Sequence, residues 1–205
     1  LAVEKGFYVV SDEIYEKLIY DGEEHVSIAS LGEDIFKQTI VINGVSKSYA
    51  MTGWRIGYTA GPTEVIKAMS SLQSQVASGS NSIAQYAAEE ALRSPKGAAE
   101  IERMRKAYDK RRQHIVARLN AIDGLKCVMP KGAFYVFPSI QKFGLSSDEF
   151  AERLLREERL AVVPGTAFGE CGEGFLRISY AYSLEDLKKA LERLKHFIRK
   201  LEAEK

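Results

Sequence analysis

Short apolar runs alternate with longer amphipathic segments along the chain, and this alternation predicts an α/β protein. Two of the runs, Phe7–Val10 and Thr39–Ile42, are continuous and too short for helices, so we expect them to be strands buried on both faces. A third strand is expected over Arg55–Ala60. Gly61 and Pro62 follow it, and a helix can begin with Pro62 in its first turn.

Helical periodicity dominates the rest of the chain. A helix is expected over about 83–92, ended by Ser94–Pro95. A longer one, over about 96–122, places apolar residues at helical spacing with charges between them, and its length suits a connector between two subdomains. Ser146–Glu149 resembles a capping box that opens another helix, and Ser183–Asp186 opens the last one.

The second half of the chain also contains short apolar runs typical of strands. These candidates are Leu125–Met129, Ala133–Phe137, Leu160–Val163 and Phe175–Tyr180. We therefore expect a sheet-containing first part, about 1–95, followed by a smaller α/β second part, about 96–205.

Composition excludes several classes of protein. With 205 residues, 45% of them hydrophobic, the chain can bury a sizeable core, which excludes disorder. Twenty-nine basic and 28 acidic residues give a net charge of +1, so the composition predicts neither a nucleic acid nor a membrane surface as partner. No apolar run is long enough to cross a bilayer and no signal segment opens the chain, which favours a cytoplasmic protein.

Cysteine content and the first residues add two expectations. Cys127 and Cys171 lack a second Cys or a His at metal-ligand spacing, so we expect two unpaired thiols and no metal site. The chain opens at Leu1 rather than Met, at what looks like the end of a helix followed at once by a strand. This opening predicts the interior of a longer protein.

Candidate chemistry follows the first two expected strands. Ser11–Tyr15 comes after the first strand and Asn43–Arg55 after the second, and in open α/β sheets ligands bind beyond the carboxyl ends of the strands. Together they offer a carboxylate, a phenol, an amine and a guanidinium. Each also has a simpler explanation, with Asp12 as a turn or cap residue and Lys47 and Arg55 as solvated surface charges.

The combination of motifs resembles the class I/II aminotransferases, which are fold-type I enzymes that use pyridoxal 5′-phosphate. The segment GVSKSYAMTGWRIGY at 44–58 is similar to their cofactor-lysine segment, especially in the aspartate-aminotransferase-like subgroup. Further matches occur in the same order along the chain, at Val10–Tyr15, His25–Leu31, Gly132–Phe137, Val163–Gly169 and Phe175–Ser179. The resemblance implies part of the mostly parallel sheet of the large cofactor-binding domain, over 1–95, and a connecting helix with the small C-terminal domain, over 96–205.

The resemblance also implies a role for each candidate residue. Lys47 would attach to the cofactor and move the substrate proton, Asp12 would keep the pyridine nitrogen protonated, and Tyr15 would donate a hydrogen bond to the 3-oxygen of the ring. Arg55 would pair with the cofactor phosphate, and Arg177 would bind the substrate α-carboxylate. A planar guanidinium suits both anions. The implied reaction moves an amino group between an amino acid and a 2-oxo acid.

The same resemblance implies that the chain is the C-terminal portion of an enzyme about twice as long, and that the enzyme is a homodimer. The glycine-containing phosphate loop, the aromatic ring that stacks on the pyridine and the N-P-x-N-P-T-G segment of the family do not occur here. Alone, the chain is therefore expected to be inactive or weakly active. Two other interpretations remain open: a non-catalytic regulatory or cofactor-sensing module, and a purely structural or interaction domain.

Overall fold

The computed structural model describes residues 1–204, and the chain divides into two compact units, Leu1–Arg105 and Lys106–Lys205. The division falls inside the long helix α5 (Pro95–Asn120), which begins in the first unit and ends in the second. Each unit holds its own small sheet, so the predicted α/β architecture is confirmed. The domain boundary expected at 95/96 lies ten residues before this division, beside the start of α5 at Pro95, and stays a prediction.

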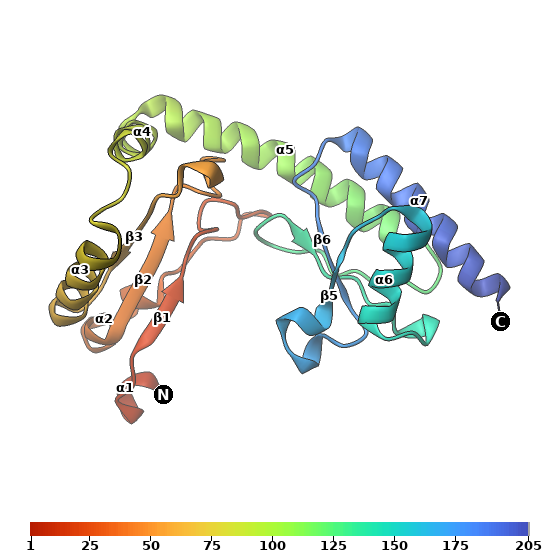
Figure 1. Ribbon diagram of the computed structural model, residues 1–205, viewed down its shortest axis with the longest axis horizontal. Helices are drawn as coiled ribbons and strands as arrows, with labels where there is room; N and C mark the ends of the chain where they lie inside the picture. The colour runs from red at the N-terminus through yellow and green to blue at the C-terminus, as the bar shows by residue number, and fades with distance from the viewer. Residues whose placement is uncertain (205) are drawn as a thin grey trace. The chain divides into compact units, whose positions relative to one another are not determined.

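The first unit is built on a three-stranded sheet in the order β1-β2-β3. Its strands are β1 (Val9–Asp12), β2 (Thr39–Gly44) and β3 (Gly57–Ala60), which lie side by side in Figure 1. Its helices are α1 (Ala2–Lys5), α2 (Glu33–Gln38), α3 (Thr63–Ala77) and α4 (Ser82–Arg93), with short 3-10 turns η1 (Ile28–Ser30) and η2 (Thr52–Trp54). β1 and β2 are parallel, whereas β2 and β3 are antiparallel.

The burial expected for the first two strands is wrong for this chain. Val10 on β1 is 63% exposed and Ile42 on β2 is 36% exposed, so neither strand is covered on both faces by the described residues. Phe7 and Tyr8, the start of the predicted first strand, precede β1 and are also exposed. The reason is that no other element of the first unit packs over these side chains.

The second unit has a smaller sheet, in the order β4-β6-β5. Its strands are β4 (Tyr135–Val136), β5 (Val163–Pro164) and β6 (Leu176–Ser179), and all of their pairings are antiparallel. Its helices are α6 (Ser147–Glu158) and α7 (Leu184–Ala203), with 3-10 turns η3 (Gln141–Phe143), η4 (Gly165–Phe168) and η5 (Glu170–Gly172).

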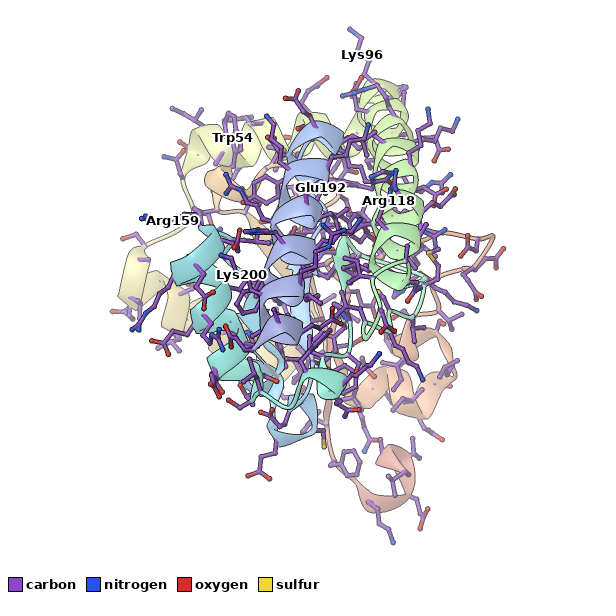
Figure 2. All side chains as sticks on the ribbon, turned by 90° about the vertical axis from the view of Figure 1, so that its right-hand side faces the viewer. Trp54, Lys96, Arg118, Arg159, Glu192 and Lys200 are labelled. Carbon is purple, nitrogen blue, oxygen red and sulfur yellow. The ribbon has the colours of Figure 1, made fainter. Side chains whose placement is uncertain are left out.

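Helix α7 supplies much of the core of the second unit. The buried side chains that it contributes are Leu187, Leu191, Leu194, Phe197, Ile198 and Leu201, which recur at helical spacing. Phe197 meets Phe150 of α6 edge to face, with ring centroids 5.0 Å apart. Charged side chains such as Glu192 and Lys200, labelled in Figure 2, lie on the same helix outside this core, and Lys200 pairs with Glu158.

Both predicted N-caps are confirmed. The Ser146 hydroxyl accepts a hydrogen bond from the Glu149 backbone N–H at 3.2 Å, and the Ser183 hydroxyl accepts one from the Asp186 N–H at 3.1 Å. Each cap satisfies one of the amide groups that a helix leaves unpaired in its first turn. These caps fix the start of α6 and α7 at the residues that the sequence indicates.

The strand predicted over Leu125–Met129 does not form. Lys126 makes only an isolated bridge to Ser139. The Asn120 side chain takes both backbone groups of Cys127, accepting from its N–H at 2.8 Å and donating to its carbonyl at 2.9 Å. These groups cannot also join a ladder, so the segment stays irregular.

The two thiols are unpaired, as the sequence predicts. Burial raises the pKa of Cys127 to about 11, despite a backbone hydrogen bond from Phe137 that acts in the opposite direction, whereas Cys171 is exposed. None of the helices in the described part of the chain has the length and apolar character needed to cross a membrane.

Candidate active site

The parallel pairing of β1 and β2 brings two of the candidate segments to one edge of the first sheet. Asp12, the last residue of β1, is in register with Ile42 of β2. The Glu13 backbone N–H continues the ladder by donating to the Ile42 carbonyl at 2.8 Å. The turns that follow both strands therefore leave the sheet at the same end, as expected for ligand sites in α/β proteins.

Gly44 allows these two turns to pack closely. A Cβ at this position would lie 2.8 Å from the Ile56 carbonyl oxygen and 3.3 Å from the Cδ1 atom of Ile14. The first distance is shorter than real Cβ contacts, so only glycine fits without movement of the backbone. Ile14 lies between Asp12 and Tyr15, and the start of the lysine segment thus packs directly against the carboxylate turn.

Asp12 presents an exposed carboxylate at this edge. Its Oδ1 atom accepts a hydrogen bond from the Ile14 backbone N–H at 3.2 Å, which closes an Asx turn. Among residues 1–204, no lysine, arginine or histidine pairs with this carboxylate. Tyr15 is half-buried in the turn that follows, and its carbonyl accepts from the Leu18 N–H at 2.8 Å.

Lys47 lies half-buried in a turn directly after β2. Backbone hydrogen bonds from Tyr49 to the Val45 carbonyl and from Ala50 to the Lys47 carbonyl, both of 3.3 Å, shape this turn. Ser48, the next residue, is fully buried and anchors the segment. The lysine is thus held on a short hydrogen-bonded turn.

Arg55 ends the same segment in an unusual backbone conformation. Its φ of 55° is left-handed, a region that residues other than glycine, asparagine and aspartate rarely adopt. One guanidinium nitrogen, Nη1, donates to the Thr52 carbonyl at 2.9 Å, and no carboxylate of the described residues pairs with the arginine. Its positive charge therefore has no carboxylate counterpart among residues 1–204.

A cavity of about 580 Å³ adjoins Arg55 and is also lined by the first residues of α4. Its lining residues are Gly53, Trp54, Arg55, Asn81, Ile83 and Ala84. Trp54, labelled in Figure 2, is 46% exposed. An unpaired guanidinium near the amino end of a 12-residue helix provides the donors and the positive potential that a phosphate group requires.

Glu13 is a residue of the site region that the sequence did not single out. It is 7% exposed, and its carboxylate accepts hydrogen bonds from Ser27 at 2.6 Å, His25 at 3.0 Å and Ser11 at 3.1 Å. Burial alone raises the pKa of Glu13, but the three hydrogen bonds together bring this pKa below its ordinary value. Its position between the candidate residues Asp12 and Tyr15 could have identified Glu13 from the sequence.

Arg177, the remaining candidate, belongs to the second unit and lies on β6. It is half-buried, and its guanidinium carbon lies 4.6 Å from the centre of the Tyr135 ring and 4.3 Å from that of Phe168. In the first unit, Asp12 thus ends β1, Tyr15 and Lys47 lie in turns, and Arg55 follows η2, while Arg177 occupies a strand of the second unit.

The fold is α/β, and polar side chains of the first unit lie at or just beyond the carboxyl ends of β1 and β2. This arrangement defines the class as an α/β protein with a ligand site at the carboxyl ends of its strands. The model of the class I and II aminotransferase family matches residues 1–194. The chain belongs to this family, and the resemblance in its motifs is confirmed.

Curated relatives support this assignment. The chain is 49% identical over 198 residues to an aspartate aminotransferase of Pyrococcus abyssi, a match that covers 97% of this chain and 50% of that protein. It is 46% identical over 198 residues to aromatic-amino-acid aminotransferase 2 of Thermococcus litoralis, again covering 97% of this chain and 50% of the relative. The chain therefore spans about half the length of the curated relatives it matches.

Solved structures agree with the sequence comparison. The aromatic aminotransferase of Pyrococcus horikoshii superposes with a TM-score of 0.94 at 48% identity, over 98% of this chain and 53% of that one. The aspartate aminotransferase of Rhizobium meliloti gives a TM-score of 0.89 at 41% identity, over 95% and 50% of the two chains. Aspartate and aromatic aminotransferases of this kind use pyridoxal phosphate.

Proposed function

We propose that the protein to which this chain belongs transfers an amino group between an L-amino acid and a 2-oxo acid with pyridoxal 5′-phosphate, and that the chain is its lysine-bearing C-terminal portion. One observation carries this proposal: the Lys47 turn packs against the Asp12 turn at one edge of the sheet. The relatives, named as aspartate and aromatic aminotransferases, favour this activity over a non-catalytic regulatory or cofactor-sensing module.

The residues of the first unit fit the chemical groups of the cofactor. Asp12 offers an exposed carboxylate without a cationic partner among the described residues, which suits a protonated pyridine nitrogen. Arg55 offers a guanidinium without a carboxylate partner, beside the start of α4, which suits a phosphate. We assign the phenol of Tyr15, in the same turn as Asp12, to the 3-oxygen of the ring.

The remaining two assignments concern the reaction. When bound, the cofactor acts as a sink for the electrons released when a substrate proton leaves. We assign Lys47 as the covalent attachment point and as the base that holds and returns this proton. We assign Arg177 to the substrate α-carboxylate, because its guanidinium has no carboxylate partner in the described chain.

We extend the proposal to the organisation of the whole protein. Residues 1–95 are the remainder of a large cofactor-binding domain, and residues 96–205 are a connecting helix with a small C-terminal domain. The protein acts in the cytoplasm as a homodimer. Support comes from the coverage of about half of each relative and from the sheet of each unit. The names of the relatives make aspartate and the aromatic amino acids the first donors to test.

Replacing Lys47 with Ala in the full-length protein tests the proposed function. Because no other amine would take its place, we expect the variant to lose the visible absorbance of lysine-bound pyridoxal phosphate. Amino transfer should fall by at least about three orders of magnitude. The matched control is Lys67→Ala, which removes an exposed lysine of α3 and should leave both signals intact. Retained transfer in Lys47→Ala would contradict the proposal.

The isolated 205-residue chain provides a second comparison. Productive chemistry requires the cofactor to be held within fractions of an ångström, so a site missing its stacking and phosphate-loop contacts should turn over poorly. We expect the chain alone to transfer amino groups much more slowly than the full-length protein. Comparable rates for the two would show that the described residues suffice.

A further inference from the structure

Arg177 is held differently from Arg112 and Arg153, two arginines of the second unit that pair with carboxylates. Arg112 is 1% exposed and pairs with Asp109 and the Pro130 carbonyl, and Arg153 pairs with Glu157 and Glu204. Arg177 is half-buried on the central strand β6, yet within residues 1–204 no carboxylate or carbonyl accepts a hydrogen bond from its guanidinium. Its guanidinium instead lies over two aromatic rings.

The Arg177 guanidinium lies over both of these rings. Its central carbon lies 4.6 Å from the Tyr135 ring centre and 4.3 Å from the Phe168 ring centre, both well within the range of a cation–π contact. Such contacts stabilise the positive charge through the electron-rich faces of the rings. The N–H donors lie in the plane of the guanidinium and point outward from its edge, and since no described acceptor bonds to them they are available to a planar anion.

Tyr135 is placed by the pairing of the second sheet. It is in register with Ser179, and Arg177 is therefore its diagonal neighbour on the same face of the sheet. The Tyr135 ring is itself packed against Phe134, with centroids 4.8 Å apart, and Phe134 is 9% exposed. The ring thus extends from a buried aromatic pair.

Phe168 is placed by a close contact between two glycines. It ends η4, which begins at Gly165, and a Cβ at Gly165 would lie only 2.0 Å from the Gly172 carbonyl oxygen. The Gly165 N–H also donates to the Phe175 carbonyl at 2.8 Å. Phe168 meets Phe137 edge to face at 6.1 Å, and Phe137 stacks on Phe175 at 5.4 Å. The glycine contact and the adjoining Phe137 ring therefore fix the position of Phe168.

We propose that Tyr135 and Phe168 are positioning residues that clamp Arg177 between their rings and aim its unpaired N–H edge at a ligand carboxylate. This inference rests on the role proposed for Arg177 in substrate binding. It extends that role, because the two aromatic rings orient the guanidinium in place of an acidic side chain. An acidic side chain would compete with the substrate for the N–H donors of Arg177, whereas the rings do not. A lysine in place of Arg177 could neither stack between the rings nor offer a planar pair of donors.

The experiment measures how well the full-length, cofactor-loaded protein distinguishes a carboxylate from an uncharged analogue. The two probes are 3-phenylpropionate and 3-phenylpropan-1-ol, which share one skeleton, and calorimetric titration gives a Kd for each. The test variants are Phe168→Leu and Arg177→Lys. The control is Phe175→Leu, which removes a ring of the same aromatic cluster that takes no part in the cation–π contacts of Arg177. Phe168 is 50% exposed, so its replacement should not disturb folding.

For the wild type, we expect the carboxylate to bind at least tenfold more tightly than the alcohol. Phe168→Leu should reduce this ratio by about tenfold, the size of a partly desolvated cation–π contact, while the Kd of the alcohol changes by less than about twofold. Tyr135→Leu should act in the same direction and Tyr135→Phe, which keeps the ring, should restore the ratio. Phe175→Leu should leave it unchanged.

Two outcomes separate this inference from the function on which it rests. If Arg177→Lys abolishes the preference for the carboxylate but Phe168→Leu preserves it, the clamp is wrong and the role of Arg177 stands. If Arg177→Lys leaves the preference unchanged, the role proposed for Arg177 is itself wrong. Equal loss of affinity for acid and alcohol in Phe168→Leu would indicate a purely structural ring and would also overturn the clamp.

Discussion

At the scale of single residues, Glu13 connects the candidate site to the stability of the first unit. Glu13 lies between Asp12 and Tyr15 in the sequence. Its carboxylate is buried and accepts three side-chain hydrogen bonds. Two of the donors, His25 and Ser27, come from a different part of the chain and join it to the turn that carries Asp12. These hydrogen bonds thus tie the turn to the strand residue Ser11 and to the segment that carries His25 and Ser27.

The titration of Glu13 gives a testable dependence on pH. The fold lowers the pKa of this carboxyl below its ordinary value of 4.5, so its ionised form contributes stability above that pH and the contribution is lost as pH falls through the lower folded value. We expect Glu13→Gln to be less stable than the wild type by about 1 kcal/mol at pH 7, with a difference that shrinks below pH 4.5.

Denaturant unfolding at a series of pH values measures this difference. The control is Glu33→Gln, which removes an exposed carboxylate that pairs only with Lys37. Surface ion pairs of this kind contribute about 0–1 kcal/mol, so the control should differ little from the wild type. A constant gap between Glu13→Gln and the wild type from pH 7 to pH 3 would exclude the proposed role of ionisation.

At the scale of elements, the sequence predicts helices with strong periodicity and caps better than it predicts short strands. The start of α7 follows from Ser183 and its core face from leucines at helical spacing. The strand expected over Leu125–Met129 does not form, because the Asn120 side chain hydrogen-bonds both backbone groups of Cys127. No local sequence pattern reveals this contact. Short strands depend on partners distant in sequence, which periodicity cannot identify.

The candidate site shows the same division. The adjacency of the Asp12 and Lys47 turns could be inferred, since strands followed by polar residues meet at one sheet edge. The left-handed backbone of Arg55 and the aromatic neighbours of Arg177 could not, because each is a product of three-dimensional packing. The roles of the five candidate residues remain predictions.

Gly165 offers a test of how one element is held. Because an added Cβ would overlap the Gly172 carbonyl, Gly165→Ala must separate η4 from η5. We expect a loss of about 2–4 kcal/mol in the free energy of unfolding, measured by chemical denaturation. Gly79→Ala is the control, since a Cβ there meets nothing within 4 Å. Equal stability of the two variants would show that the glycine contact is not needed.

At the scale of the whole molecule, the two units differ in how well they cover their apolar side chains. The second unit buries the inner face of α7 almost completely. In the first unit, α3 has no buried residue, and Leu72 and Val76 on it are 67% and 74% exposed. Ile83 and Tyr86 of α4 are 72% and 74% exposed.

This exposure predicts how the isolated 205-residue chain behaves in solution. Contiguous apolar surface of this kind favours association, so we expect the chain to bind a hydrophobic dye and to form oligomers that grow with concentration. The double variant Leu72→Glu, Val76→Glu should reduce both effects without unfolding, because both side chains are exposed. Light scattering after gel filtration measures the association. A chain that stays monomeric at all concentrations and does not raise the fluorescence of the dye would contradict the prediction.

The left-handed backbone at Arg55 has a consequence for how such a site evolves. Glycine or asparagine would occupy this conformation with less strain, so a variant such as Arg55→Gly should be as stable as the wild type or more so. Natural variation that favoured only stability would therefore tend to erase this arginine. If Arg55 binds the cofactor phosphate as proposed, selection for binding at this position opposes selection for folding, and a substitution that stabilises the chain here would cost binding.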